Sequence, residues 1–349
     1  MSVPAAILEQ FGLDPAIHQV EKTGSGHINF TYLVKGPSSA WILQRINTNV
    51  FRQPEIIAAN LRHAATHLAN RYPDYLFLAA IPTITGSEMA RDEQGDPWRL
   101  FPYIENTITI DKVDTPDQAF EAAKGFAGLT RKLDDIDTSL FHPTIPGFQD
   151  LGWRWRQLEE ALANSTPERK QEADSAIRDA LSFSFLVSDH ERFTSGGLLK
   201  SRIVHNDTKI NNILFDKTSG KAVCVIDLDT LMPGHFIYDL GDMVRTFVSP
   251  VSEEEKDVTR IAFRRPMYEA LLEGYRSEMQ DCLSPAEQQA IPFAGMMMTY
   301  IMAIRFLADF LNGNIYYQIH YPEQNLVRAT NQLRLLSLLR DALPYSSID

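Results

Sequence analysis

The residues best suited to chemistry gather in one short stretch of the chain, residues 204–229. Asp207 is followed five positions later by Asn212, and Lys209 lies between them, whereas Asp227 ends the next apolar run. Phosphoryl transfer from a nucleotide needs a proton acceptor for the attacking hydroxyl and cations that balance the charge on the phosphoryl oxygens. Carboxylate and amide oxygens are the ligands that Mg²⁺ prefers. The spacing therefore predicts phosphoryl transfer, in which Asp207 is the catalytic base, Lys209 reaches the γ-phosphoryl group, and Asn212 and Asp227 hold magnesium.

Other chemistries explain this stretch less well. A metal-dependent hydrolase would use His205-x-Asp207 and Asp227-x-Asp229 as ligands of two metals, but it leaves the lysine and the asparagine without a role. A nucleotide-binding scaffold without activity would lack the base or a metal ligand, and here both are present. We expect His205 to brace the loop by hydrogen bonding rather than to take part in the reaction.

Two elements must position these side chains. Short β-prone runs at 213–215 and 222–226 flank Lys-Thr-Ser-Gly, which is typical of a hairpin. Residues 201–229 therefore form a β-rich island within a part of the chain that is otherwise helical. Apolar residues at helical spacing predict the surrounding helices, which cover 115–133, 150–163, 167–189, 253–279, 284–311 and 323–342.

The first 103 residues follow a different pattern. Residues 31–34 and 41–46 flank the turn Lys-Gly-Pro-Ser-Ser and predict a hairpin, and a helix is predicted over 54–72 behind Pro54. Further strands are predicted at 84–86 and 98–104, with a turn over 92–96. We therefore predict the α+β class, with a small antiparallel-sheet lobe carrying one long helix over residues 1–103 and a large, mostly helical lobe over 104–349.

Composition excludes several classes of function. The formal net charge is −12 and no basic cluster occurs, so we expect no nucleic-acid partner. The two cysteines, Cys224 and Cys282, cannot make a disulfide framework, and this favours a reducing compartment. The apolar segment 291–311 contains Arg305 and Asp309, so we interpret it as a buried helix and expect no membrane partner. The N-terminus is unlike a signal peptide, and we expect a cytoplasmic protein.

The motifs resemble those of a known superfamily. His205-x-Asp207-x-Lys209-x-x-Asn212, followed by Ile-Asp227, is similar to the catalytic loop and metal motif of the aminoglycoside phosphotransferase and choline kinase superfamily, relatives of the protein kinases. Asp239-Leu-Gly-Asp is similar to the element that follows that motif. Within the superfamily the chain most resembles the N-acetylhexosamine 1-kinases, through Gly-His-Ile-Asn, Ile-Asp-Leu-Asp-Thr-x-Met-Pro-Gly, Arg-Phe-Leu-Ala-Asp and Tyr-Pro-Glu-x-Asn-Leu-Val-Arg. These blocks run from about residue 24 to residue 328.

The resemblance implies a bilobal, protein-kinase-like fold that binds ATP and Mg²⁺. It makes residues 24–34 a hairpin that covers the phosphates, and residues 101–106 a hinge whose backbone contacts adenine. The residues that this resemblance assigns to the nucleotide are Gly24, Ser25, Gly26, Asn29, Gln44, Pro102, Tyr103 and Ile104. It also implies that Asp239 braces the catalytic loop.

One expected group is missing from this set. Kinases carry a lysine on the third strand, which binds the α- and β-phosphates and pairs with a glutamate. Strand alternation and the resemblance both place Gln44 there, and glutamine brings no charge. Either Arg45 substitutes for the lysine, or the phosphates depend more on magnesium and Lys209. Glu55 is a guess for the glutamate partner.

The acceptor hydroxyl must lie near Asp207. The candidates for the acceptor site are His27, Asp207, Asp229, Arg305 and Tyr316, and the resemblance to the hexosamine kinases supports His27, Arg305 and Tyr316. Alternatives stay open for three of these residues. Arg305 could pair with a carboxylate such as Asp239 or Asp242, Tyr316 could be a surface aromatic, and Asp229 could be a second carboxylate beside the metal or could cap the turn that follows it.

We therefore predict a kinase that phosphorylates a sugar hydroxyl, with the anomeric 1-OH of an N-acetylhexosamine (N-acetylglucosamine or N-acetylgalactosamine) as the preferred acceptor. The alternatives are an aminoglycoside, for which the acidic net charge leaves room, or choline, homoserine or thioribose. A choline-binding site would require an aromatic cage with carboxylates. The residues leave the oligomeric state open.

Overall fold

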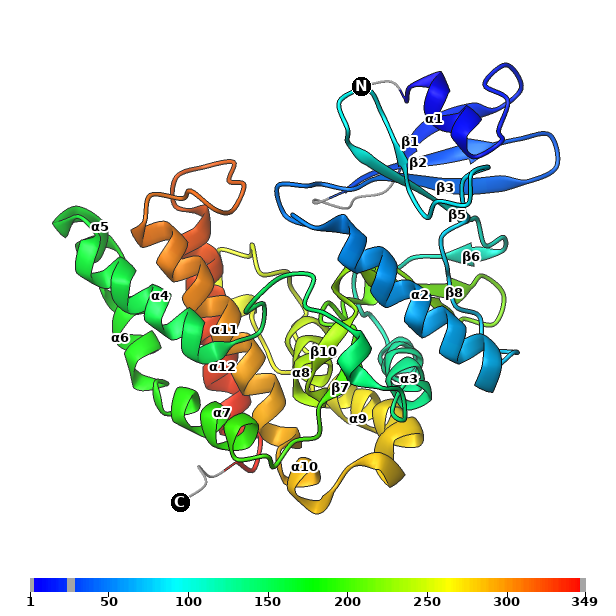
Figure 1. Cartoon of the computed structure of the whole chain (residues 1–349). Helices are drawn as coiled ribbons and strands as arrows, with labels where there is room; N and C mark the ends of the chain where they lie inside the picture. Colours follow the sequence, from blue (N-terminus) through cyan, green and yellow to red (C-terminus); the bar gives the residue numbers. More distant parts are fainter. Residues whose placement is uncertain (1–2, 24–28, 346–349) are drawn as a thin grey trace.

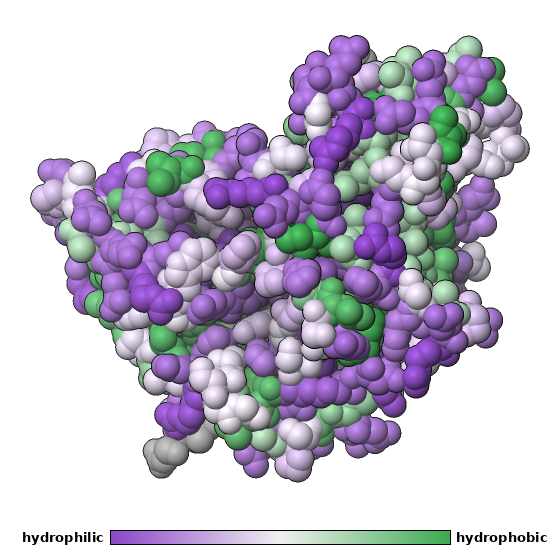
Figure 2. All heavy atoms as spheres, in the orientation of Figure 1, coloured by the Kyte–Doolittle hydropathy of each residue, from purple (hydrophilic) through white to green (hydrophobic). Residues whose placement is uncertain are grey.

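A computed structural model describes residues 3–23 and 29–345 of the chain. A smaller lobe built on a five-stranded antiparallel sheet stands above a larger, mostly helical lobe (Figure 1). Figure 2 shows an indentation of the surface where the two lobes meet. This arrangement confirms the predicted α+β class.

The sheet of the smaller lobe presents two different faces. Its strands run in the order β1-β2-β3-β5-β4, and comprise β1 (Gln19–Thr23), β2 (Phe30–Lys35), β3 (Ala40–Arg45), β4 (Ala90–Arg91) and β5 (Pro97–Pro102). One face carries the buried side chains of Tyr32, Leu43 and Leu100, which pack with helix α1 (Ala5–Gln10) in a core of their own. Because side chains alternate along a strand, Gln44 and Arg99, which lie directly opposite each other on β3 and β5, belong to the other face.

The predicted strands of this lobe agree with the structure except at one place, and β1 and β4 were not predicted. The hairpin β2–β3 and the strand β5 are confirmed. Residues 84–86, which were expected to form a strand, form a turn instead. Gly86 has φ +84° and its N–H donates to the carbonyl oxygen of Thr83 at 2.9 Å, and this left-handed conformation is incompatible with a strand.

The long helix α2 (Pro54–Arg71) is confirmed, but its packing is unexpected. Its buried residues Ile57, Leu61 and Leu68 belong to the hydrophobic core of the larger lobe, and not to the core under the sheet. Asn60 adds two hydrogen bonds from its Nδ2, to the carbonyl oxygens of His142 at 2.8 Å and of Leu231 at 3.0 Å. The chain therefore passes from the smaller lobe to the larger one both before α2 and again after β5.

The larger lobe surrounds helix α11 (Ile291–Leu311), which contacts α8, α12 and α4. This helix is long and apolar enough to cross a membrane, yet 83% of its most apolar window is buried within the protein, as expected for a core helix. The other helices of this lobe are α3 (Pro116–Lys132), α4 (Leu151–Asn164), α5 (Pro167–Glu172), α6 (Asp174–Ser182), α7 (Phe185–Ser195), α8 (Phe236–Phe247), α9 (Arg265–Met279), α10 (Pro285–Gln289) and α12 (Gln324–Ala342), with 3₁₀ turns η1 (Thr138–Leu140), η2 (Ile210–Asn212), η3 (Leu228–Thr230), η4 (Val258–Arg260) and η5 (Gln280–Cys282).

Three of the predicted helices are shorter than expected. The segment 167–189 is divided among α5, α6 and α7, and 284–311 is divided between α10 and α11. The segment 253–279 becomes helical only at Arg265. Pro266 occupies the first turn of α9, where its missing N–H costs nothing, and the Asp257 side chain accepts the N–H of Thr259 in the separate turn η4.

The β-rich island is confirmed and holds two small sheets. The predicted hairpin is β8 (Ile213–Asp216) with β9 (Ala222–Val225), and the unpredicted strand β6 (Thr107–Ile108) adds to its edge. Strand β7 (Arg202–Val204) pairs with β10 (Met232–Gly234). The catalytic motif begins where β7 ends, and the segment that leaves β5 is anchored to the same island through β6.

Candidate active site

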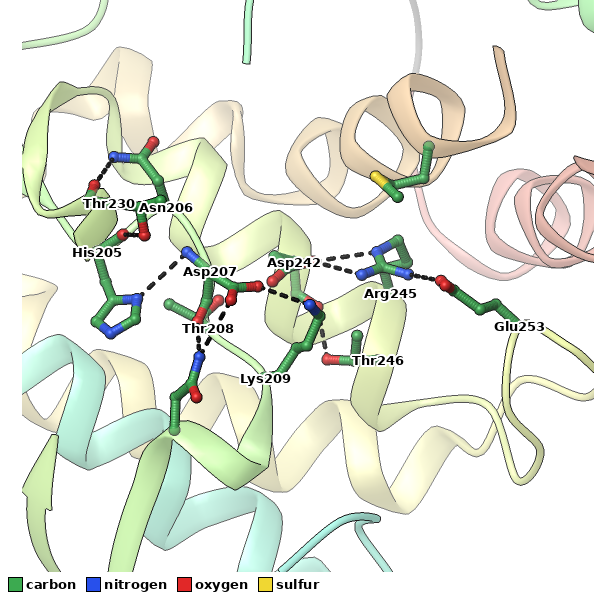
Figure 3. Close-up of polar contacts among 12 residues, drawn as sticks. His205, Asn206, Asp207, Thr208, Lys209, Thr230, Asp242, Arg245, Thr246 and Glu253 are labelled. Atoms are coloured by element: carbon green, nitrogen blue, oxygen red, sulfur yellow. Dashed lines mark hydrogen bonds and ion pairs between the residues drawn. The ribbon is translucent and has the colours of Figure 1, made fainter. Parts of the chain in front are cut away.

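The loop that follows β7 is held in place by hydrogen bonds to the first turn of α8. The carboxylate of Asp239, in the first turn of α8, accepts the backbone N–H of His205 at 2.9 Å and that of Asn206 at 2.7 Å. Asn206 has a left-handed backbone with φ +66°, and its Nδ2 donates to the carbonyl oxygen of Thr230 at 3.0 Å (Figure 3). A non-glycine residue in this conformation is strained and persists only where its surroundings hold it. Asp239 thus braces the loop.

His205 joins this loop to the second motif. Its Nε2 lies 2.9 Å from the carbonyl oxygen of Ile226 and its Nδ1 accepts the N–H of Asp207 at 3.2 Å, as expected of a neutral ring protonated on Nε2. The N–H of Ile226 in turn donates to the carbonyl oxygen of Asn212 at 2.9 Å. The residue before Asp227 is therefore tied to both ends of the catalytic loop. The structure brings Asp207, Asn212 and Asp227 together, and it gives His205 the bracing position that we expected.

Asp207 carries two close polar contacts (Figure 3). Lys209 Nζ lies 2.9 Å from its Oδ1, and Asn212 Nδ2 lies 3.2 Å from its Oδ2. Burial opposes the charged carboxylate, but the ammonium of Lys209 outweighs burial and holds the pKa of Asp207 below its usual value. The carboxylate of Asp207 raises the pKa of Lys209 in return. Asp207 is therefore ionised at neutral pH and able to accept a proton.

Asp227 has the opposite electrostatic surroundings. Its backbone is left-handed, with φ +56°, the residue is exposed to solvent, and its carboxylate accepts no hydrogen bond from the described residues. Partial removal from bulk water and the nearby carboxylates of Asp229 and Asp207 raise its pKa to about 6. The carboxylates of this site thus carry more negative charge than its own cations balance.

This charge and the donor atoms fit a hard divalent cation. Asn212 directs its amide nitrogen to the carbonyl oxygen of Asp207 at 2.9 Å, which leaves its amide oxygen for a metal. Asp227 adds a carboxylate without a hydrogen-bond partner among the described residues. Within residues 3–23 and 29–345, no group of three or more His, Cys, Asp or Glu side chains could hold a metal ion. The protein therefore offers only a partial oxygen shell, as Mg²⁺ requires when substrate phosphates complete it.

Sequence reasoning missed the cation on the other side of the cleft. Arg99, on β5, is only 3% exposed, and its guanidinium lies 2.5 Å from Oδ1 of the buried Asp229. Asp229 Oδ2 accepts the Nδ2 of Asn29 at 2.6 Å, so both of its oxygens contact the smaller lobe. Asp229 therefore does not act as a simple cap of its turn. Its predicted contact with the acceptor stays a prediction.

Gln44 occupies the expected place of the strand lysine and contacts Arg99. Its Oε1 accepts from Arg99 at 3.1 Å and 2.9 Å, and its Nε2 donates to Thr31 Oγ1 at 3.2 Å. Arg45 is ion-paired to Asp96 at 2.9 Å, and strand alternation directs it away from Gln44. Arg45 therefore does not replace the lysine.

The other predicted nucleotide contacts differ in outcome. Glu55 forms an exposed ion pair with Arg91, so it is not the acidic partner that kinases use. Asn29 Oδ1 accepts the N–H of Asn47 at 3.0 Å, so this side chain links the lobes in addition to any phosphate contact. Gly24, Ser25, Gly26 and His27 lie outside the described residues, and their assignments remain predictions.

The predicted hinge has little backbone free for adenine. The N–H of Tyr103 is bonded to the carbonyl oxygen of Ala40 at 3.1 Å, and the carbonyl oxygen of Ile104 accepts the Thr107 hydroxyl at 2.7 Å. Proline has no N–H. Among the described residues, the N–H of Ile104 is therefore the one donor that Pro102, Tyr103 and Ile104 leave without a partner.

Arg305 stands on α11 without a carboxylate partner among the described residues. Its guanidinium lies 5.5 Å from the ring centre of Phe148 and 5.6 Å from that of Tyr317. The expected alternative of a salt bridge is wrong, because Asp239 binds the catalytic loop and Asp242 pairs with Arg245 at 2.8 Å (Figure 3). A half-buried, unpaired cation is costly unless a ligand meets it.

Arg305 itself donates from Nη1 to Met302 Sδ at 3.5 Å, a weak acceptor, and other hydrogen-bond donors nearby have no partner in the described part of the chain. Arg154 Nε and the Tyr317 hydroxyl are buried and have no hydrogen-bond partner among the described residues. Burial and the neighbouring Arg305 lower the pKa of Arg154 to about 10. The next residue after Phe148, Gln149, donates from Nε2 to the carbonyl oxygen of Asn206 at 3.1 Å. This cluster of donors therefore adjoins the catalytic loop. No motif in the sequence indicated Arg154 or Tyr317.

Tyr316 lies on the loop between α11 and α12. Asp309 Oδ1 accepts the backbone N–H groups of Ile315 at 3.0 Å and of Tyr316 at 2.8 Å, and Asp309 Oδ2 accepts that of Tyr317 at 2.9 Å. The Tyr316 side chain is 65% exposed, while its neighbour Tyr317 faces Arg305. Tyr316 is therefore a surface aromatic beside this donor cluster, and its contact with the acceptor stays a prediction.

A cavity of about 490 Å³ adjoins the catalytic loop at Asn206 and is also lined by Phe148 and Gln149, which lie beside the donor cluster. Asp207, Asn212 and Asp227 do not line it. These three residues lie with Arg99 and Asp229 between the two lobes, outside this cavity.

Comparisons with known proteins agree with this geometry. A model of the phosphotransferase enzyme family, APH, matches residues 19–276. The fold is similar to that of the microcompartment-associated aminopropanol kinase, which is 16% identical with a TM-score of 0.66 over 97% of each chain. It is also similar to an aminoglycoside phosphotransferase from Alicyclobacillus acidocaldarius, which is 15% identical with a TM-score of 0.61 over 98% of this chain and 96% of that one.

A third similar structure is the amicoumacin kinase hAmiN in complex with AMP-PNP, Ca²⁺ and Ami. It is 14% identical, with a TM-score of 0.58 over 95% of this chain and 91% of that one. At these identities the likeness shows the fold, and it confirms the bilobal, kinase-like architecture.

Proposed function

Because the chain belongs to the phosphotransferase enzyme family, and is therefore an enzyme that transfers a phosphoryl group to a hydroxyl, we propose that ATP is its donor and an N-acetylhexosamine its acceptor. The attacking hydroxyl is the anomeric 1-OH. Its proton passes to the carboxylate of Asp207, while its oxygen attacks the γ-phosphorus and ADP leaves. Lys209, whose Nζ is 2.9 Å from Asp207, contacts a transferred phosphoryl oxygen in this proposal.

Magnesium, when held by Asn212 and Asp227, supplies positive charge against the phosphates. The side chains of the protein arrange the catalytic loop and the base. Asp239 and His205 fix the loop before substrate arrives, and the ionised state of Asp207 makes it a base at neutral pH. Such preorganisation is the main resource for phosphoryl transfer, because little covalent chemistry is left to the protein.

The observation that carries the acceptor proposal is a cluster of donors without oxygen acceptors. Arg154 Nε and the Tyr317 hydroxyl have no hydrogen-bond partner among the described residues, and the printed hydrogen bond of the Arg305 side chain goes to the sulfur of Met302, which is a weak acceptor. Two of these three groups are cationic. Such a cluster repels an aminoglycoside or choline, since each carries positive charge. A neutral sugar with hydroxyls and an acetamide carbonyl supplies the oxygens that these donors need, and the resemblance to hexosamine kinases supports the same acceptor.

A second class of acceptor is favoured by the same observation. An alcohol that carries a carboxylate, such as homoserine, could pair with Arg305 through a charge-assisted hydrogen bond. It differs from the hexosamine in needing a full negative charge. The experiment below distinguishes the two.

We would measure ADP formation and the phosphorylated product for a panel that contains N-acetylglucosamine, N-acetylgalactosamine, homoserine, choline and kanamycin. The two N-acetylhexosamines should be phosphorylated best, and Arg305→Met should raise their KM about tenfold while the KM for ATP stays unchanged. Arg340→Met, which removes an arginine that stacks on Phe183 away from the cleft, is the control and should leave both KM values unchanged. A preference for kanamycin or choline would overturn the acceptor proposal.

A further inference from the structure

We propose that Arg99 is a positioning residue that holds the two lobes and the metal-binding turn in register, in the role that the lysine–glutamate pair has in protein kinases. This inference rests on the proposed function, because it concerns the same phosphoryl-transfer site. It names a residue that lies 55 positions after Gln44 in the chain and meets it only through the pairing of β3 with β5.

Arg99 is held in one orientation by the smaller lobe. Gln44 Oε1 accepts from two of its nitrogens, at 3.1 Å and 2.9 Å, and Thr31 Oγ1 fixes the other end of the Gln44 amide at 3.2 Å. Thr31 and Gln44 face each other in the register of β2 and β3, as Gln44 and Arg99 do in that of β3 and β5. Thr31, Gln44 and Arg99 thus form a row across the sheet, and this row ends in the positive charge of Arg99.

That charge is directed at the larger lobe. Asp229 Oδ1 lies 2.5 Å from the guanidinium, and the two side chains are 4% and 3% exposed. Asp229 belongs to the turn η3, which begins directly after Asp227. The next residue, Thr230, donates its hydroxyl to the carbonyl oxygen of His205 at 2.7 Å. The ion pair between Arg99 and Asp229 therefore restrains both the turn that follows Asp227 and the catalytic loop.

Asn29 completes the contact between the lobes. Its Nδ2 donates to Asp229 Oδ2 at 2.6 Å, while its Oδ1 accepts the N–H of Asn47. Asn29 is also the residue that follows Gly24-Ser-Gly-His-Ile28 in the sequence. A single carboxylate of the larger lobe therefore contacts both the sheet face above the cleft and the end of the glycine segment.

Removing one partner of a buried ion pair leaves the charge of the other partner buried and uncompensated. The acidic partner is Asp229 of the larger lobe, and not Glu55, which pairs with Arg91 at the surface. A lysine at position 44 would repel Arg99, and this explains why a glutamine occupies the usual lysine position. Arg99 and Asp229 therefore act as a unit.

The test is a double-mutant cycle with Arg99→Met, Asp229→Asn and the double variant. Binding of Mg²⁺·ADP is measured by calorimetry, which needs no acceptor, and kcat and KM for ATP are measured with the best acceptor. Each single variant should raise the Kd for ADP about tenfold and lower kcat/KM for ATP about 100-fold. The double variant should be no worse than the worse single one, because residues that act as a unit are not additive.

Arg91→Met removes an ion-paired arginine from the edge of the same sheet and should leave Kd and kcat/KM unchanged. Arg99→Lys keeps the positive charge but lacks the paired N–H donors of the guanidinium. Its losses of ADP affinity and of kcat/KM for ATP should therefore be smaller than those of Arg99→Met. A fold defect alone would lower kcat through the active fraction and leave Kd and KM unchanged, which would contradict the proposal. Additive losses in the double variant, as direct phosphate binding by Arg99 would produce, overturn it as well.

The outcome is separable from that of the acceptor proposal. Non-additive loss of ADP binding without hexosamine phosphorylation would uphold the role of Arg99 and reject the acceptor. Failure of the wild-type protein to bind ADP would overturn both.

Discussion

Two groups of charged side chains in this protein contain a buried arginine, yet they serve different purposes. The distal cluster comprises Lys200, Arg202, Asp134 and Glu287. The cleft cluster comprises Arg99, Lys209, Asp207, Asp227 and Asp229. In the distal cluster two cations meet two carboxylates, whereas in the cleft cluster two cations meet three.

The distal cluster is fully paired. Arg202 is completely buried, lies 2.7 Å from Asp134 and is ion-paired to Glu287. Although burial acts in the opposite direction, hydrogen bonds from Lys200 and Arg202 lower the pKa of Asp134, and those from Arg202 and Ser284 lower that of Glu287. All of its charges are satisfied within the fold.

The cleft cluster has one carboxylate too many. Arg99 pairs with Asp229 and Lys209 pairs with Asp207, so Asp227 is left over, and its pKa rises to about 6. The comparison shows that pairing stabilises a structure, whereas an unbalanced carboxylate prepares a site for a cation that the protein does not contain.

Asp207→Asn should have the largest effect on the cleft cluster. Without a base, kcat should fall on the order of 10³-fold, while the Kd for ADP stays within a few-fold because the amide keeps the shape of the side chain. Steady-state kinetics and calorimetry would measure the two. Glu287→Gln in the distal cluster is the matched control and should keep its kcat. Unchanged turnover of Asp207→Asn would reject its role as the base.

Arg202→Met should act on stability alone. It leaves the buried carboxylate of Glu287 without an ion-pair partner and leaves Asp134 with Lys200 alone, and we expect the free energy of unfolding to fall by about 3–5 kcal/mol, with kcat per folded molecule unchanged. Urea denaturation would measure the change. Arg178→Met, in an exposed pair with Asp174, should cost less than about 1 kcal/mol. Equal losses from the two variants would remove the distinction between a buried and an exposed pair.

Gln44→Lys restores the lysine that other kinases use, and it should lower kcat/KM for ATP about tenfold, since the new ammonium faces Arg99. Gln44→Met, which removes the hydrogen bonds but adds no charge, should cost less. Adding Arg99→Gln to Gln44→Lys should recover activity by exchanging the two groups across the strands. A gain of activity from Gln44→Lys alone would show that Arg99 does not occupy this role.

Asp227→Asn should have the smallest and least intuitive effect on stability. The carboxylate has an ordinary pKa of 3.8 and a pKa of about 6 in the folded protein, so its ionised form destabilises the fold above pH 6. In chelator at pH 7.5 the variant should have a Tm a few degrees above the wild type, although its metal-supported turnover is lost. The gain should vanish below about pH 4, where the carboxyl is protonated in both states. A lower Tm at pH 7.5 would contradict the excess of charge.

The catalytic loop was predictable because its geometry is local. Asp207 and Asp227 are 20 positions apart in the sequence, with Asn212 between them, and one hairpin is enough to bring them together. Arg99 was not predictable in this way. Its role depends on the register of β3 with β5 and on a contact with Asp229 in the other lobe, and neither is encoded by a nearby residue pattern.

The acceptor side shows the same limit. Arg305 was evident because a cation interrupts an apolar helix. Arg154 and Tyr317 were not, since each lies in an ordinary sequence and gains its meaning only from its unpartnered donor beside Arg305. The packing of α2 was also missed, because an apolar stripe shows that a helix is buried and does not show which core buries it.

That packing has a mechanical consequence. Since α2 belongs to the core of the larger lobe, the chain crosses between the lobes three times, at residues 46–53, 72–89 and 103–106. Three separate covalent connections restrain the sheet from sliding or twisting away from the larger lobe. Opening of the cleft to exchange nucleotide must therefore bend all three connecting segments together.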